Sequence, residues 1–150
     1  FGDVIFTLMF MGLPIMVIAC LSTPLVPCAN VLLFAITLIL SYFIAFNLFY
    51  LIGLISFITT NIWGIFLTFD LVNLFLSGAL LPLRFMPEWL VSIIKLLPFR
   101  YIVDFPISVW LTGKAGVEEV FIQILWVVIL SVLTKVIYRQ AIAKLDIFGG

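Results

Sequence analysis

The feature that most constrains this sequence is a long segment without any charged side chain. Between Asp3 and Asp70 the chain carries no lysine, arginine, aspartate or glutamate. Over the whole chain, 66% of the residues are hydrophobic and only 9% are charged, whereas soluble domains carry about 25% charged residues. A soluble domain of 150 residues has too high a surface-to-volume ratio to bury so much apolar sequence. The sequence therefore predicts an integral membrane protein.

Four apolar runs predict an all-α membrane protein with about four membrane-spanning helices. A helix of about 20 apolar residues crosses a hydrocarbon core of about 30 Å, and the runs cover residues of about 4–21, 29–52, 62–81 and 120–138. The prolines of Ser22–Pro27 (STPLVP) predict the first turn. The second turn is predicted within Gly53–Gly64, because one helix over residues 29–81 would be about 80 Å long.

The segment Leu76–Lys114, here called the central segment, is too apolar for an ordinary loop and too interrupted for a membrane span. It holds four of the seven prolines and four of the seven lysine and arginine residues. We expect Pro82 to end the third span and Pro87 to begin a short helix that stops before Pro98. A second short helix is expected from about Pro106 to Gly113. Neither helix can span a bilayer, so residues of about 82–113 predict a re-entrant or interfacial hairpin before the last span.

Three polar residues within the predicted spans require a partner or access to water, because unpaired polar groups are costly in lipid. Asn47 is expected to form a hydrogen bond with another helix. Asp70 and Asn73 are three residues apart and therefore share one face of the third span. Two interpretations remain open for this pair: a substrate-pathway or proton-linked site, or a hydrogen-bonded contact between helices.

Two arginines of the central segment have two possible roles. Arg84 and Arg100 can contact lipid headgroups or an amphiphilic substrate. Alternatively, they pair with Glu88 and Asp104 and hold the shape of the hairpin. The sequence does not choose between these interpretations.

Charge and composition set the orientation and exclude several kinds of function. Basic residues follow the last span, so the positive-inside rule predicts a cytoplasmic C-terminus and a hairpin on the outer face. The formal net charge is zero, which gives no basis for nucleic-acid binding. The chain has no histidine, which removes histidine-based catalysis and most zinc or haem sites.

Cys20 and Cys28 are interpreted as small apolar residues, although a disulfide between them is possible. Because the first residue is Phe1 rather than methionine, we expect the C-terminal part of a longer protein.

Three stretches of the central segment resemble the C-terminal half of ABC type-2 permeases, the membrane subunits of ATP-binding-cassette exporters. They are SGALLPLRFMPEWL (Ser77–Leu90), LPFRY (Leu97–Tyr101) and FPISVWLTGK (Phe105–Lys114). The residues Ile55–Gly64 and the terminal Gly-Gly are also similar to that family. The resemblance covers essentially the whole chain, and its order of glycines and prolines is more specific than any single proline.

The resemblance implies a six-span permease in the plasma membrane, of which this chain supplies the last four spans. Two permeases, identical or not, pair in the family and are driven by two separate ATPase subunits. This chain would then bind no cofactor and would not be an enzyme, with ATP held by the partner. Gly113-Lys114 lacks the first glycine of a P-loop. In the family the hairpin helps to close the outer mouth of the pathway, which implies shaping roles for Gly78, Pro82, Pro87, Pro98, Pro106 and Gly113.

Two other functions were weighed against a permease. A secondary transporter or channel using Asp70 would need a repeat or a second intramembrane charge, and the sequence shows neither. An intramembrane protease is suggested by the pair Glu118-Glu119. That family needs an arginine four residues after the second glutamate and histidines downstream, whereas Gln123 stands at that position and histidine is absent.

Overall fold

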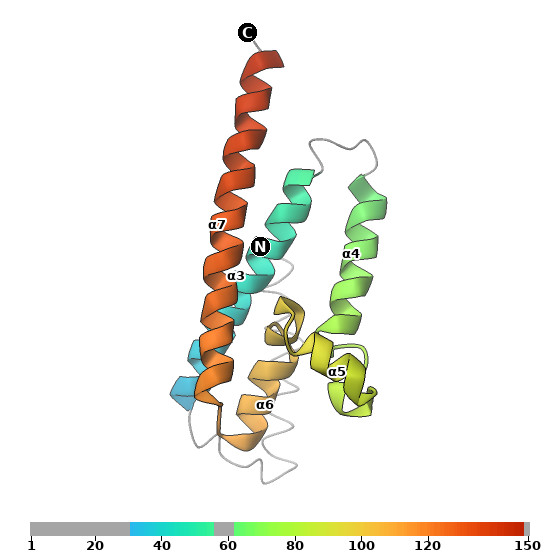
Figure 1. Cartoon of the computed structure of the whole chain (residues 1–150), viewed down its shortest axis with the longest axis vertical. Coiled ribbons are helices and arrows are strands. Elements are labelled where there is room, and N and C mark those ends of the chain that lie inside the picture. The colour runs from blue at the N-terminus through green and yellow to red at the C-terminus, as the bar shows by residue number, and fades with distance from the viewer. Residues whose placement is uncertain (1–30, 56–61, 149–150) are drawn as a thin grey trace, which may run out of the picture.

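The computed structural model describes the backbone of residues 31–55 and 62–148 and the side chains of residues 31–55 and 63–141. Within these ranges the chain is helical and contains no strand. The elements are α3 (Val31–Ile55), α4 (Ile62–Leu76), the 3₁₀ helix η2 (Leu83–Phe85), α5 (Glu88–Ile94), the 3₁₀ helix η3 (Pro98–Tyr101), α6 (Asp104–Thr112) and α7 (Val117–Phe148) (Figure 1). The predicted first span, the STPLVP turn, both cysteines and most of the second predicted turn lie outside the described residues.

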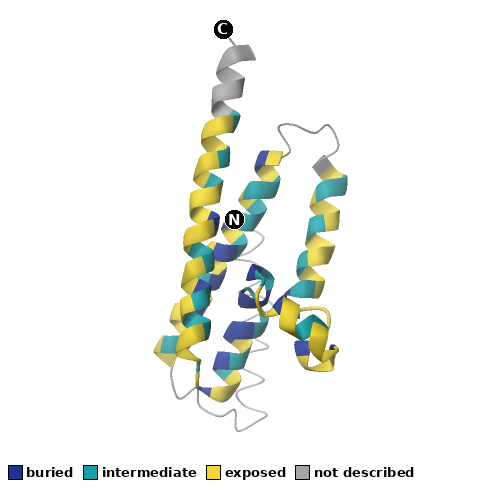
Figure 2. Cartoon of the chain, in the orientation of Figure 1, coloured by how far each residue is buried: buried dark blue, intermediate teal, exposed yellow. Residues whose placement is uncertain are grey.

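Two long helices, α3 and α7, pack side by side and form the main body of the described structure (Figure 1). Both are long and apolar enough to cross a membrane. At about 1.5 Å per residue, α3 is about 37 Å long and α7 about 48 Å. Most of their apolar side chains are exposed (Figure 2), which a soluble protein would not tolerate over such an area. These observations are consistent with a helical membrane protein.

Helix α7 continues well beyond the predicted end near residue 138. It runs to Phe148, because its last turns contain arginine, glutamine, alanine, lysine and leucine, which favour helix, and neither proline nor glycine. Glu118 and Glu119 lie in its first turn, where acidic side chains interact favourably with the helix dipole.

Helix α4 is shorter than the predicted third span. It ends at Leu76 rather than near residue 81, and its length of about 22 Å is less than the hydrocarbon thickness of a bilayer. Pro82 is not the residue that ends it. The chain leaves the helix at Ser77 and Gly78, where Gly78 has a φ of +80° that other residues rarely adopt.

We predict that Gly78→Ala will destabilise the protein by about 1–2 kcal/mol, which is the strain of the left-handed conformation for an L-residue. The added Cβ would lie 3.4 Å from side-chain atoms of both Asp104 and Leu83, so space adds little to this cost. Thermal unfolding of the detergent-purified full-length protein measures the effect. The control is Gly53→Ala in α3, where no described atom outside the adjacent helical backbone lies within 4 Å of the new Cβ and alanine favours helix. Equal stability of the two variants would contradict the prediction.

The central segment packs across one end of α3 and α7, at the opposite end from the C-terminus (Figure 1). It contains four short elements rather than the two predicted. As predicted, α5 begins directly after Pro87, and α6 ends at Gly113 in the left-handed conformation. Helix α5 ends at Ile94, and Pro98 begins η3 instead of stopping the preceding helix. Pro106 lies inside the first turn of α6.

Two groups of buried side chains hold the segment in place. The larger group joins α3, η3, α6 and α7 and consists of Ile44, Tyr101, Phe105, Val109 and Leu130. The smaller group packs η2 against α5 and consists of Leu83, Met86 and Ile94. The central segment is therefore attached to the long helices through η3 and α6, whereas η2 and α5 form a separate unit beside α4.

Candidate functional site

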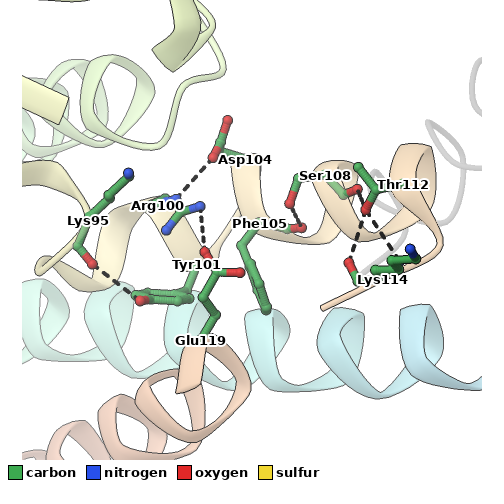
Figure 3. Close-up of polar contacts among 9 residues, drawn as sticks. All are labelled: Lys95, Arg100, Tyr101, Asp104, Phe105, Ser108, Thr112, Lys114 and Glu119. Carbon is green, nitrogen blue, oxygen red and sulfur yellow. Dashed lines mark hydrogen bonds and ion pairs between the residues drawn. The ribbon is translucent and has the colours of Figure 1, made fainter. Parts of the chain in front are cut away.

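The guanidinium of Arg100 joins three elements at the centre of the site (Figure 3). Its Nε donates to Asp104 Oδ2 at 3.1 Å, and its Nη2 donates to Glu119 Oε1 at 3.0 Å. Arg100 belongs to η3, Asp104 begins α6 and Glu119 lies in the first turn of α7. Only 9% of Arg100 is exposed, so its two carboxylate partners compensate a charge that has little contact with solvent.

The surroundings of Arg100 favour its charged form. Burial alone would lower its pKa, but the hydrogen bonds to Asp104 and Glu119 outweigh burial and raise the pKa above its ordinary value. Burial also raises the pKa of the neighbouring Tyr101 hydroxyl, although the Arg100 charge opposes that shift. Both shifts move a pKa further above neutral pH, so the Arg100 guanidinium stays charged and the Tyr101 hydroxyl stays protonated.

A buried amide, Gln123 on α7, forms a second junction. Its Nε2 lies 2.9 Å from the Thr37 carbonyl oxygen, 3.1 Å from Ser41 Oγ and 3.3 Å from the Tyr101 carbonyl oxygen. The Ser41 hydroxyl lies 2.6 Å from that same Tyr101 carbonyl. Gln123 is completely buried, and hydrogen bonds of this kind hold membrane helices together where water is excluded. The amide therefore connects α3, η3 and α7 at one point.

Further hydrogen bonds fix the backbone around η3. The Tyr101 hydroxyl donates to the Lys95 carbonyl at 3.2 Å (Figure 3). The Trp126 indole on α7 donates to the Leu96 carbonyl at 3.1 Å. The turn after α4 is joined to α6 by the Asp104 amide, which donates to the Ser77 carbonyl at 3.1 Å. The central segment is thus tied to both of the long apolar helices.

An open pocket of about 540 Å³ lies between η2, α5, η3 and α6. Its lining combines apolar and charged side chains and consists of Leu83, Arg84, Met86, Glu88, Val91, Ser92, Lys95, Arg100 and Asp104. Within the described part of the chain, Arg84 and Glu88 form no ion pair with one another. The Arg84 guanidinium lies instead over the Phe85 ring, 5.0 Å from its centre.

Arg84 and Arg100 have different surroundings in the structure, although the sequence did not distinguish their roles. The predicted pairing of Arg100 with Asp104 is present, and Glu119 is an additional partner that the sequence did not indicate. Arg84 is exposed and lines the pocket. Arg100 is therefore paired with two carboxylates, whereas Arg84 forms no ion pair in the described part of the chain.

The other predicted polar residues lie away from this pocket. Asp70 is on an exposed side of α4, and Asn73 is half-buried with an Oδ1 atom that has no hydrogen-bond partner in the described structure. Neither lines the pocket. Asn47 makes its predicted contact with another helix, because its amide lies 3.4 Å from Ser131 Oγ on α7. It also donates to the Phe43 carbonyl at 2.8 Å within its own helix.

Sequence reasoning missed the structural roles of Gln123 and Ser41. The available signal was their position, because each is a polar residue within an apolar helix and therefore needs a partner. That signal applies equally to Asn47, Asp70 and Asn73, so it does not identify which polar residues meet. The pairing follows only from the packing of α3 against α7.

Comparison with known proteins supports the interpretation of the long apolar helices. A family model described as "ABC-2 family transporter protein" matches residues 1–149. Neither the curated proteins nor the solved structures gave a match. The family match covers almost the entire chain, including the central segment and both helices that can cross a membrane. The chain therefore belongs to the ABC-2 transporter family and is a membrane permease.

Proposed function

We propose that this chain is part of the permease subunit of an ATP-binding-cassette exporter in the plasma membrane. It forms the translocation pathway with a second permease, and separate ATPase subunits drive it. The observation that carries this proposal is the match of residues 1–149, nearly the whole chain, to the ABC-2 transporter family. The arrangement of the central segment at one end of α3 and α7 supports a gating role for it.

The proposed topology places the C-terminus in the cytoplasm and the central segment at the outer face. Helix α7 is about 48 Å long, so it extends beyond a hydrocarbon core of about 30 Å. Lys135 and Arg139 lie in its C-terminal half, and basic residues favour the cytoplasmic side. The central segment packs near the other end of α7. In this topology residues of about 82–113 form the re-entrant hairpin, and four spans cross the membrane. The third span contains the short helix α4, and a local thinning of the bilayer would accommodate its length.

Two kinds of contact suggest how such a gate would open. Directional hydrogen bonds from Arg100 and Gln123 join η3 and α6 to α3 and α7, so these elements move together. The body of helix α4 instead contacts its neighbours through aromatic rings, with Phe69 5.4 Å from Phe49 and 6.2 Å from Phe99 between ring centres. Within the described residues, only the turn after α4 is held to α6 by a backbone hydrogen bond, from the Asp104 amide to the Ser77 carbonyl. Apolar ring contacts have weak directionality and permit small sliding movements. Closure of the ATPases would shift α3, η3, α6 and α7 together against α4 and open a route beside the hairpin.

We predict that the full-length protein purified from its native membrane will be associated with an ATPase that contains a P-loop. In sealed vesicles this complex should transport its substrate only when ATP is supplied to the cytoplasmic side. Replacing the P-loop lysine of the ATPase should reduce transport to background, because that lysine binds the transferred phosphates. The measurement is substrate flux across the vesicle membrane, with ATP hydrolysis followed in parallel.

The variant Asp70→Asn distinguishes this function from a secondary transporter. An exporter driven by ATP should retain its flux in this variant, because Asp70 forms no ion pair in the described part of the chain. Flux that follows an ion gradient, needs no ATPase and disappears in Asp70→Asn would refute the exporter proposal. The cytoplasmic C-terminus is tested separately, by labelling a cysteine added after Gly150 from either side of the membrane.

A further inference from the structure

The pocket of the central segment contains charges that no other side chain compensates. Arg84, Glu88 and Lys95 are all exposed, and in the described part of the chain none of them forms an ion pair. Arg100 and Asp104 also line the pocket, but Arg100 is paired with Asp104 and with Glu119, which does not line it. The unpaired charges that line the pocket are therefore two cations, Arg84 and Lys95, and one carboxylate, Glu88.

Helix α5 and the turn after it present two different exposed sides. Residues spaced like successive helical turns give an apolar side that consists of Trp89, which is 66% exposed, Ile93 and Leu96. The neighbouring side is polar, faces the pocket and consists of Glu88, Ser92 and Lys95. A third side packs inward, where Ile94 is buried against η2. Most of helix α5 is coloured as exposed in Figure 2.

This division is what a short helix at a membrane surface requires. Tryptophan and tyrosine gather at the level of the lipid headgroups, and an interfacial helix places its apolar side toward the acyl chains. Phe85, which is also largely exposed, lies beneath the Arg84 guanidinium, which is 5.0 Å from the Phe85 ring centre. The apolar side of α5 would therefore contact acyl chains at the same depth at which the pocket meets headgroup phosphates.

We propose that this pocket binds the phosphate group of a membrane phospholipid. Arg84 and Lys95 provide the charged contacts, and the acyl chains lie along Trp89, Ile93 and Leu96. The two unpaired cations can contact the single negative charge of a phosphodiester, and the open shape of the pocket admits a headgroup. The proposal rests on the proposed function in one respect, because that function places the central segment at a membrane surface. It requires neither ATP nor transport.

The test is a titration of the full-length protein in neutral detergent with phosphatidylglycerol, followed by native mass spectrometry. The double variant Arg84→Ala/Lys95→Ala should bind this lipid roughly 30-fold more weakly, because each basic residue near a lipid headgroup contributes about a fivefold gain in affinity. Glu88→Gln should bind a few-fold more tightly, because it removes the free carboxylate. The control Lys114→Ala removes a cation of the same segment that does not line the pocket, and it should leave affinity unchanged.

Three results would overturn the proposal. One is equal lipid affinity in the native protein and in the Arg84→Ala/Lys95→Ala variant. Both substituted positions are exposed, so this variant should fold normally, and its melting temperature checks that it does. Another is an equal loss of affinity in Lys114→Ala, which would show a general charge effect. The third is displacement of the lipid by equimolar glycerol 3-phosphate, which would identify a site for soluble phosphate compounds. Since no ATP is present, absence of lipid binding leaves the exporter proposal intact, and failure of ATP-driven flux leaves the lipid site intact.

Discussion

The variant Gln123→Glu should lose about 3–5 kcal/mol of stability, although it changes the side chain by a single group. At neutral pH it places a carboxylate where the amide nitrogen now lies between the Thr37 and Tyr101 carbonyl oxygens and the Ser41 hydroxyl. Two of these three partners can only accept hydrogen bonds, and the site is completely buried. An uncompensated charge in such a site has a cost of this size. Thermal unfolding of the detergent-purified full-length protein measures it.

Gln123→Leu provides the informative comparison for this variant. It should lose only about 1–2 kcal/mol, because it removes hydrogen bonds without adding a charge. The native Gln123 Oε1 atom also has no hydrogen-bond partner in the described structure, so leucine removes one unfavourable group. Gln140→Glu, at an exposed position of the same helix, should change stability by less than about 0.5 kcal/mol. If Leu were worse than Glu at position 123, shape rather than hydrogen bonding would determine this junction.

Replacement of Arg100 by methionine should destabilise the protein by about 2–3 kcal/mol. The change leaves Asp104 and Glu119 close together without their shared cation, and breaking a buried ion pair by removing one partner costs about 3–5 kcal/mol. The lower figure applies because the Glu119 side chain is 37% exposed and water screens part of its charge. Transport should fall as well, since this guanidinium joins η3 and α6 to α7. Unfolding in detergent and flux in vesicles give the two measurements.

Two further variants test the reason for that loss. Arg100→Lys should be intermediate, because an ammonium group keeps the charge but does not reproduce the two fork-like contacts of a guanidinium. Arg139→Met, at an exposed position of α7, should stay within about 0.5 kcal/mol of the native protein. A stable Arg100→Met variant that unfolds like Arg139→Met would show that the carboxylates are solvated and that Arg100 does not hold the segment.

The amino-acid sequence alone determined the features that depend on hydropathy and on local backbone limits. Helices α3 and α7 follow from apolar runs long enough to cross a bilayer. The start of α5 after Pro87 and the end of α6 at Gly113 follow from the fixed φ of proline and the positive φ open to glycine. The end of α4 was predicted at Pro82, but the chain already leaves the helix at Gly78, four residues earlier.

Only the tertiary structure decided which polar side chains meet. Gln123 and Ser41 are 82 residues apart, and both contact the carbonyl of Tyr101 only because α3, η3 and α7 converge there. Arg84 and Arg100 look alike in the sequence, yet one is exposed in an open pocket and the other is buried between two carboxylates. Helix formation depends on neighbours within a few residues, whereas the partner of a polar group depends on which distant segment packs against it.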